Sequence, residues 1–257
     1  IEEDGKAAKV KYLLTIYLFQ TVSVPQTIQD YFFEGNDAIM NSNYDEAIDA
    51  YKRILDYGFE SSDLYHNLGN AHFRIGNIGK AIWAYNKSLM LNPREEDVKY
   101  NLSIAEARVI DQIEIPKDVA LIKLYSGLKM YFTTREWFLL CSLLTLFTCF
   151  IHSILNAKIS IGKAIQKTRF MLITLTLITH FIGFDSYFSN KYANNAVIVK
   201  NFVDVFSEPR NDNNKPLFRI HEGTVVDVAN RQNGWSEISL IDGNKGWVKA
   251  GTIMVLK

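Results

Sequence analysis

The residues of this 257-residue chain that could carry covalent or metal chemistry are few, namely two cysteines and five histidines. Cys141 and Cys149 lie in one apolar segment, ~12 Å apart along a helix, which is beyond the reach of a disulfide. A thiolate is costly in an apolar environment. We therefore expect both cysteines to be packing residues.

The spacing of the histidines does not make a metal site. His152 and His180 fall in two separate apolar helices, and helix rise puts them ~22 Å and ~6 Å from the same end of that pair. They cannot share a metal ion. The other three histidines occur singly in regular elements and are expected to be structural: His66, His72 and His221. Since the sequence has no glycine-rich phosphate loop or metal-spaced cluster either, we expect no catalytic residue, no metal and no cofactor, and hence no enzyme.

The elements that position these residues begin with two apolar segments. Residues 137–155 contain no formal charge over a length of ~28 Å, about the thickness of a bilayer core. Residues 170–188 form a second candidate span, with Lys167 and Arg169 able to reach the interface at one end. The loop between them, 156–169, holds four basic residues and no acidic one. The two segments predict a transmembrane helical hairpin.

Residues 1–25 predict a signal peptide or an N-terminal anchor, because the apolar run 12–24 follows three lysines. If this segment exports the residues after it, the chain before residue 137 and the chain after the second span both lie outside. The basic loop 156–169 is then cytoplasmic, in agreement with the positive-inside rule. Basic residues also flank the outer side of the first span, so the orientation depends on the export signal.

Residues 113–136 connect this region to the first span. Leu121, Leu124 and Leu128 recur at helical spacing with lysines alongside, as in a helix that lies on a membrane surface. A plain connecting helix or linker is the alternative.

An internal repeat precedes the spans. Displacing the sequence by 34 residues aligns identical residues, among them Gly35 with Gly69, Asn36 with Asn70, Ala47 with Ala81, Ile48 with Ile82, Ala50 with Ala84, and Tyr51 with Tyr85. This is the period of tetratricopeptide repeat (TPR) helix pairs, in which small residues allow the two helices to approach closely. We expect a TPR module over 26–112, with repeats at 28–61 and 62–95 and a capping helix at 96–111.

Four asparagines of this module are candidate partner-binding residues on the concave face of the solenoid: Asn36, Asn67, Asn70 and Asn101. An amide side chain both donates to and accepts from a peptide backbone, so an asparagine ladder could hold an extended peptide. The alternative is that these side chains satisfy loop or inter-helix backbone groups, and the sequence does not choose between the two.

From residue 194 to 257 the apolar pattern changes to period 2, with Asp242-Gly243 as a hairpin turn. Five or more short strands in about 60 residues indicate a small closed all-β barrel. The order EGTVVDV, NGWSEISL, DGNKGWV resembles a bacterial SH3 domain. Phe206 and Trp235 are possible groove residues, with a partly exposed packing role preferred, and Trp247 is expected in the core.

The fold class expected is thus a multidomain membrane protein with an all-α TPR solenoid, a transmembrane hairpin and an all-β SH3-like barrel. This order, together with YHNLGNAHFRIGNIGKAIWAYNKSLMLNP and LFRIHEGTVVDVANRQNGWSEISLIDGNKGWV, resembles the TPR members, of BatE type, of the Bat (aerotolerance operon) family. The resemblance covers residues 28 to 257. It implies a location in the bacterial inner membrane with both modules on the periplasmic side. It also implies Bat partner proteins with von Willebrand factor A domains, and a link to a MoxR-type ATPase and to stress or oxygen tolerance.

The charges set limits on partners. The 28 basic and 28 acidic residues cancel, but residues 26–115 hold 15 acidic and 8 basic residues. An acidic TPR surface favours basic or amide-rich ligands and excludes a nucleic-acid partner. We expect a non-catalytic membrane scaffold that binds partner proteins, with peptidoglycan binding through the SH3-like domain as the alternative.

Overall fold

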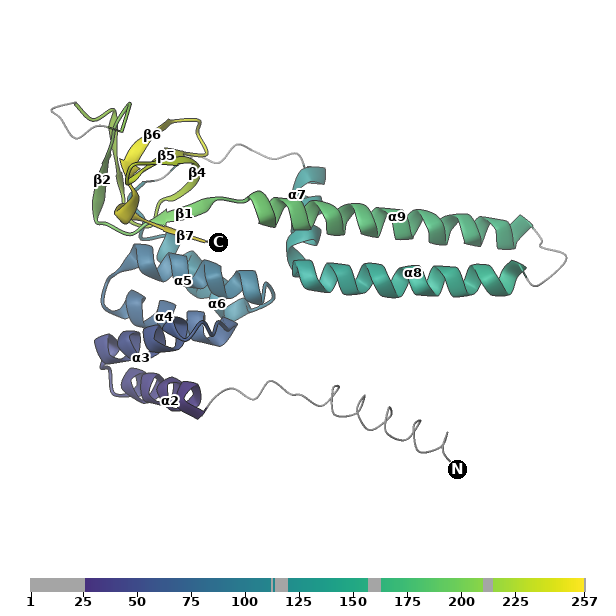
Figure 1. The fold of residues 1–257 in the computed structure, drawn as a ribbon, viewed down its shortest axis with the longest axis horizontal. Helices are drawn as coiled ribbons and strands as arrows, with labels where there is room; N and C mark the ends of the chain where they lie inside the picture. Colours follow the sequence, from purple (N-terminus) through teal and green to yellow (C-terminus); the bar gives the residue numbers. More distant parts are fainter. Residues whose placement is uncertain (1–25, 112, 114–119, 157–162, 210–214, 257) are drawn as a thin grey trace, which may run out of the picture. The chain divides into compact units, whose positions relative to one another are not determined.

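The computed structural model describes residues 26–111, 113, 120–156, 163–209 and 215–256 (Figure 1). The expected signal peptide or anchor at 1–25 and residues 157–162 of the expected basic loop lie outside the described residues. The chain divides into two compact units, residues 1–60 and 61–257, which are described separately.

The first unit contains the helix pair α2 (Gln26–Met40) and α3 (Tyr44–Asp56). Tyr51 of α3 is fully buried over Gly35 of α2, where a Cβ atom would collide with the tyrosine ring. The Tyr51 hydroxyl donates to Asn36 Oδ1 at 2.7 Å. The small residue at Gly35 is therefore required by the close packing of the two helices.

The second unit opens with the same arrangement one period later. Helices α4 (Ser62–Arg74) and α5 (Ile78–Leu91) pair, with Tyr85 buried over Gly69. The Ser61 hydroxyl caps α4 by accepting from Leu64 N at 3.1 Å. After α4, Gly76 adopts φ +82, which lets the chain reverse into α5. Helix α6 (Glu96–Glu106) packs against α5 and ends five residues before the expected boundary at 111.

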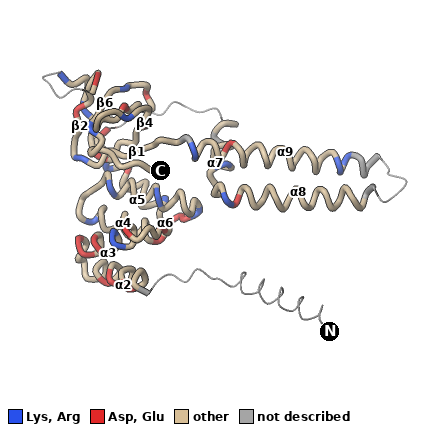
Figure 2. The backbone as a smooth tube through the Cα atoms, in the orientation of Figure 1, with Lys and Arg blue, Asp and Glu red and all other residues tan. Residues whose placement is uncertain are grey.

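Helices α7 (Ala120–Tyr131), α8 (Thr134–Asn156) and α9 (Lys163–Tyr192) come next in the chain. Two segments are long and apolar enough to cross a membrane, Thr134–Ile154 and Lys167–Lys191. In the most apolar 18 residues of each segment, only 11% and 22%, respectively, are buried inside the protein. Figure 2 shows the charged residues of α8 and α9 near the helix ends.

The expectation that the whole segment 156–169 is a loop is wrong, because α9 begins at Lys163. The next residues, including Ala164, Gln166 and Lys167, are good helix formers without glycine or proline, so the helix continues into the basic region.

The C-terminal region is a β-sheet domain, as the period-2 pattern predicts. A five-stranded antiparallel sheet has the order β6-β5-β4-β1-β7, and β2 pairs with β3 in a second sheet. The strands are β1 (Asn195–Ile198), β2 (Phe202–Val205), β3 (Phe218–His221), β4 (Val225–Gln232), β5 (Trp235–Ser239), β6 (Lys245–Lys249) and β7 (Ile253–Val255), with a short 3-10 helix, η1 (Ala250–Thr252), before β7. Gly243 adopts φ +91 in the β5–β6 connection, at the expected turn.

Both sheets bury side chains in one core, whose fully buried members include Ile198, Val205, Ile238 and Val248. Phe206, just after β2, forms a bridge with Trp247 of β6 and so joins the two sheets. The alternation of buried and exposed residues along β2 and β6 follows from the two-residue period of a strand.

The TPR helices and the β-sheet domain of the second unit share an apolar cluster. It contains Ile82 and Tyr85 of α5, Val98 of α6, and Val197 and Leu256 from the β-sheet region. Helix α6 thus packs against α5, and β1 and β7 contact that helix as well. The apolar face at the end of the solenoid is therefore covered by a helix and by two strands of the β-sheet domain.

Candidate functional site

Polar side chains of α4, α5 and α6 form a network in the second unit. Asn70 Oδ1 accepts from the Tyr85 hydroxyl at 2.8 Å and from Asn101 Nδ2 at 3.0 Å. Asn101 Nδ2 also lies 3.1 Å from His66 Nε2. Because Asn101 Nδ2 is a donor, this contact requires an unprotonated His66 Nε2. The structure thus brings together two of the four predicted asparagines, and adds His66, which the sequence analysis treated as structural.

The other two predicted asparagines, Asn36 and Asn67, are half-buried. In the first unit, Asn36 Oδ1 accepts from Tyr51 in the same way as Asn70 Oδ1 accepts from Tyr85. In both repeats the carbonyl oxygen of this asparagine therefore accepts from a tyrosine side chain of the same helix pair, and not from the backbone groups that the structural alternative named. Peptide binding by the four side chains stays a proposal.

The electrostatic surroundings of His66 favour its neutral form. Burial lowers the pKa of His66, and this effect outweighs the opposing influence of Asp97, Asp63 and Glu95. Burial also raises the pKa of Tyr85, so its hydroxyl keeps the proton that it donates to Asn70. The network is neutral at its centre and has acidic residues near it.

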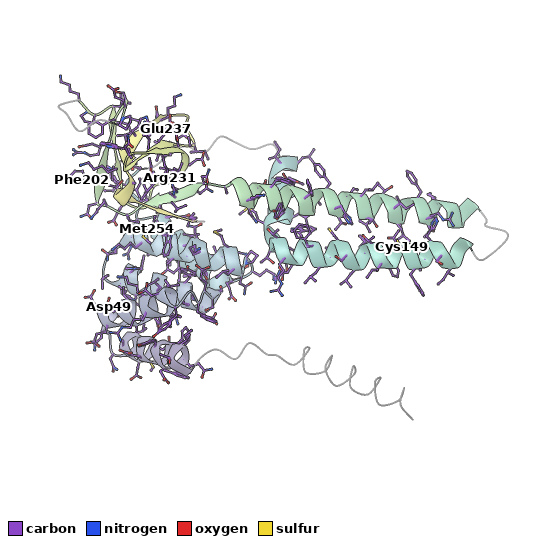
Figure 3. All side chains as sticks on the ribbon, in the orientation of Figure 1. Asp49, Cys149, Phe202, Arg231, Glu237 and Met254 are labelled. Atoms are coloured by element: carbon purple, nitrogen blue, oxygen red, sulfur yellow. The ribbon has the colours of Figure 1, made fainter. Side chains whose placement is uncertain are left out.

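The β-sheet domain carries an aromatic face. Phe206 and Trp235 meet edge to face, with ring centroids 5.8 Å apart, and Trp235 is only 7% exposed. Phe206 and Trp247 exchange both backbone hydrogen bonds, at 2.9 and 2.7 Å, so their side chains lie on the same face. Glu237, labelled in Figure 3, pairs with Trp247 on the neighbouring strand, so these two side chains share a face. Trp235 lies two residues before Glu237 on the same strand and therefore points to that face as well. All four side chains therefore belong to one face of the sheet.

The expectation that Trp247 lies in the core is wrong. Trp247 is half-buried, while its neighbours Gly246 and Val248 are buried. In a strand, adjacent side chains point to opposite faces, so the burial of Gly246 and Val248 puts Trp247 on the other side. Since Trp235 is buried and Phe206 and Trp247 are half-buried, the accessible part of the aromatic face comes from Phe206 and Trp247.

A third set of contacts ties the TPR helices to the β-sheet domain. The Asp111 carboxylate accepts from His221 N at 2.6 Å, from the Thr224 hydroxyl at 2.6 Å and from His221 Nδ1 at 2.8 Å. Burial raises the pKa of Asp111, but the hydrogen bonds from Thr224 and His221 outweigh it and the net shift is downward. Trp83 Nε1 donates to the carbonyl of Val255 at 2.8 Å. No local sequence pattern points to these pairs.

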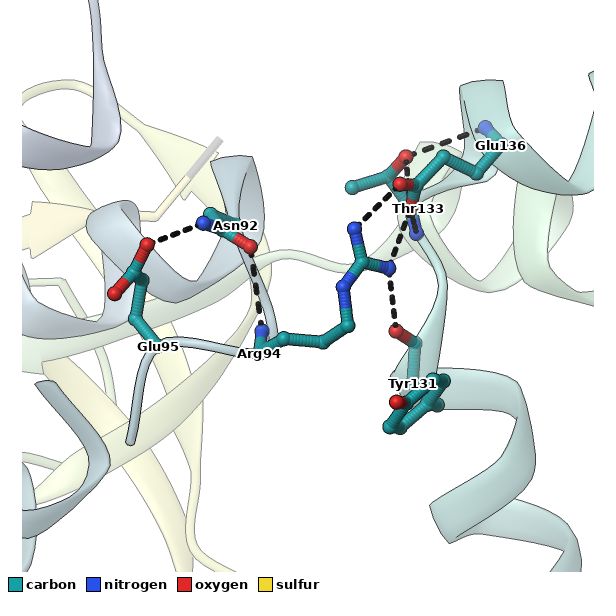
Figure 4. A network of polar contacts seen from close by, with 6 residues as sticks. All are labelled: Asn92, Arg94, Glu95, Tyr131, Thr133 and Glu136. Atoms are coloured by element: carbon teal, nitrogen blue, oxygen red, sulfur yellow. Dashed lines mark hydrogen bonds and ion pairs between the residues drawn. The ribbon is translucent and has the colours of Figure 1, made fainter. Parts of the chain in front are cut away.

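Arg94, after α5, makes a two-pronged contact with Glu136 at the start of α8 (Figure 4). Its Nη2 lies 2.6 Å from Glu136 Oε1 and its Nη1 lies 3.0 Å from Oε2. Nη1 also donates to the Tyr131 carbonyl at 3.3 Å. This parallel geometry is the strong form of an arginine–carboxylate contact. It joins the end of the TPR helices to the start of the apolar helices.

The cysteines and the apolar-segment histidines occupy α8 and α9. Cys141 is buried and its thiol donates to the Thr179 carbonyl at 3.4 Å, whereas Cys149, labelled in Figure 3, is exposed. His180 Nδ1 lies 2.8 Å from the Thr176 carbonyl. Among the described residues, no group of three or more His, Cys, Asp or Glu side chains is placed to hold a metal ion.

Comparison with known proteins identifies two modules. Residues 199–254 match the bacterial SH3 domain, and residues 62–95 match the tetratricopeptide repeat. The second match has the same bounds as the second predicted repeat. No curated protein matches the chain. The chain therefore contains a TPR and a bacterial SH3 domain, two modules that indicate protein–protein interaction or cell-wall binding.

Proposed function

We propose that the chain is a non-catalytic scaffold of the bacterial inner membrane, which holds partner proteins through its TPR and SH3 modules. The observation that carries this proposal is the junction between the modules. Asp111 bonds to His221 and Thr224, and Trp83 bonds to Val255, so the two recognition modules of the second unit form a continuous body. A scaffold benefits from such a junction because it presents two binding surfaces in a fixed arrangement.

The junction also supports the proposed topology. Residues 62–106 and 195–255 contact each other, so they belong on the same side of any membrane that the chain crosses. The helices between them must then cross an even number of times, as α8 and α9 would. Together with an exporting N-terminal segment and the basic residues near 156–169, this supports our proposal that both modules lie on the periplasmic side.

The resemblance to the TPR members of the Bat family suggests the partners. We propose other Bat membrane proteins, those with von Willebrand factor A domains, in a system associated with a MoxR-type ATPase and with aerotolerance. The partner-binding residues are Asn36, Asn67, Asn70 and Asn101.

Co-purification from membranes tests the scaffold. The variant with Asn36, Asn67, Asn70 and Asn101 changed to Ala should lose the partners that the wild-type chain retains. Tyr51→Phe combined with Tyr85→Phe is the matched control, because it removes the internal bonds to Asn36 and Asn70 and leaves the amides in place. Equal recovery of partners by the asparagine variant and the wild type would reject the asparagine ladder.

Peptidoglycan binding by the SH3 module is the second candidate, because the aromatic face of Phe206 and Trp247 is accessible. Sedimentation of the full-length chain with purified wall material tests it. If this face holds wall glycopeptide, changing Phe206 and Trp247 to Ala should abolish sedimentation while the asparagine variant still sediments. The scaffold proposal expects no sedimentation of any of the three proteins.

A further inference from the structure

Helix α7 carries an apolar stripe that no described residue covers. Leu121, Leu124 and Leu128 are 75%, 71% and 47% exposed. At 3.6 residues per turn the three side chains fall within an arc of about 60°. If α7 were a connecting helix in water, these leucine side chains would be exposed to solvent. An exposed apolar patch of this kind marks a contact with a partner or with a membrane.

The contacts of α7 fix its position along α9. The Tyr125 hydroxyl donates to Asp185 Oδ2 at 2.6 Å, and Lys129 Nζ lies 2.9 Å from the same oxygen. Lys129 Nζ also contacts Ser189 Oγ at 3.0 Å. Two residues one turn apart on α7 thus meet a single region of α9. The helix therefore crosses α9 at that region, and Figure 1 draws it so.

This crossing lies where α9 changes from apolar to polar. Residues 170–184 contain no formal charge, and Asp185 comes directly after them. On α8, Glu136 marks the corresponding change, and the buried Trp137 donates from Nε1 to the Lys129 carbonyl at 3.1 Å. If α8 and α9 span the membrane, as the proposed function requires, then α7 lies at the level of the lipid headgroups.

The leucine stripe lies on a different side of α7 from the residues that contact α9. The side of α7 that meets α9 carries Tyr125 and Lys129, and the leucine stripe is about a quarter turn from it. If α7 lies in the plane of the membrane beside α9, two of its sides lie a quarter turn from the side that contacts α9. One of these two sides faces the hydrocarbon and the other faces water. Ser126 and Met130 lie on the side away from the leucines.

We propose that α7 is an in-plane membrane helix, with Leu121, Leu124 and Leu128 inserted at the boundary between headgroups and acyl chains. The occupant of the stripe is lipid, because α7 contacts Asp185 and Trp137, and the next residues toward the middle of each apolar segment, Phe184 and Phe138, are exposed. Through Lys129 and Asp185, α7 fixes the height at which the polar modules leave the membrane.

Site-specific fluorescence of the full-length chain tests this proposal. In a background with Cys141→Ala and Cys149→Ala, single cysteines are introduced as Leu124→Cys, Leu128→Cys, Ser126→Cys or Met130→Cys and labelled with a polarity-sensitive dye. The protein is reconstituted alone into vesicles of phosphatidylethanolamine and phosphatidylglycerol. Labels at 124 and 128 should show blue-shifted emission and quenching by spin-labelled lipid. Labels at 126 and 130 should be quenched by aqueous iodide.

Two results would overturn the proposal: equal iodide quenching at all four positions, or labels at 124 and 128 that neither quencher reaches, which would mean a protein cover. Leu143→Cys on the exposed side of α8 separates this outcome from a failure of the membrane hairpin. Quenching of that label by deep lipid spin labels is expected. Its absence would reject the spans and, with them, the membrane scaffold and the interfacial helix.

Discussion

At Gly69 a Cβ atom would lie 2.6 Å from the ring of Tyr85, closer than real Cβ contacts allow. Tyr85 is 1% exposed and its hydroxyl is bonded to Asn70, so the ring has little room to move. We predict that Gly69→Ala destabilises the chain by about 1–3 kcal/mol through overpacking. A thermal melt followed by circular dichroism measures the change.

Gly127→Ala is the matched control, because Gly127 also lies inside a helix and has nothing within 4 Å of the position of its Cβ. Alanine is the better helix former, so this variant should be neutral or slightly stabilising. Equal melting behaviour of the two variants would contradict the close contact at Gly69.

The second prediction at the residue scale concerns His66. Its pKa in the folded chain is lowered below the ordinary 6.5, chiefly by burial. The folded state therefore binds fewer protons than the unfolded state near and below that pH. The contribution of neutral His66 to the stability of the fold is complete above pH 6.5, and it falls as the pH drops below this value.

We expect the melting temperature of the wild type to decrease between pH 7.5 and 5.5 more than that of His66→Gln, which has no titrating ring. If the melting temperatures of the wild type and of His66→Gln change equally with pH, the fold does not protect His66 from protonation.

At the scale of elements, the repeat period predicted that two helices approach closely at Gly69, because the small residue recurs at fixed spacing, but it did not predict that Tyr85 packs over this glycine. The strand periodicity likewise predicted the β-sheet domain, but not the face of Trp247, since the local pattern did not distinguish it from its buried neighbours. The bonds between Asp111 and His221 join residues 110 apart, and Trp83 and Val255 are 172 apart. Such pairs depend on the packing of two modules, which no short-range pattern encodes.

The Asp111 junction makes a prediction for elements. Asp111→Asn removes the charge that accepts three hydrogen bonds and should weaken the junction by about 2 kcal/mol. Backbone amides that bond next to the junction, such as Gly223 N to the Ile198 carbonyl, should exchange faster with deuterium.

Glu96→Gln serves as the control, because Glu96 is largely exposed and forms an ion pair with Lys99 on the same helix. It should leave exchange at Gly223 unchanged, as exposed pairs of this kind contribute little. If Asp111→Asn leaves exchange at Gly223 unchanged as well, contacts other than those of Asp111 hold the junction, such as the apolar cluster and the Trp83–Val255 hydrogen bond.

At the scale of the whole molecule, the zero net charge is a sum over unlike parts. An acidic TPR region, basic residues near the apolar helices and a mixed β-sheet domain cancel (Figure 2). The apolar stretches of α8 and α9 were predictable because each runs for many residues without a formal charge, whereas the start of α9 at Lys163 was not. The contact between these helices and the TPR helices was not predictable, because it depends on Arg94, which bonds to the Glu136 carboxylate 42 residues away.

The Arg94–Glu136 contact carries the last prediction. It joins the TPR helices to the start of α8. Its loss should therefore widen the range of distances between α6 and α8. Spin labels on Glu96→Cys and Leu139→Cys, in a background without the native cysteines, report that distance by pulsed electron paramagnetic resonance. Arg94→Gln should broaden the distance distribution. High salt should broaden that of the parent chain, because both partners are partly exposed and are screened by ions.

Arg219→Gln provides the comparison, since Arg219 makes a similar two-pronged contact with Asp204 inside the β-sheet domain. Its loss should leave the α6–α8 distribution unchanged. Exchanging the charges by combining Arg94→Glu with Glu136→Arg should narrow the distribution again if attraction between the two side chains limits the motion. A distribution in Arg94→Gln as narrow as that of the parent chain would mean that the helices are held together by contacts other than this pair.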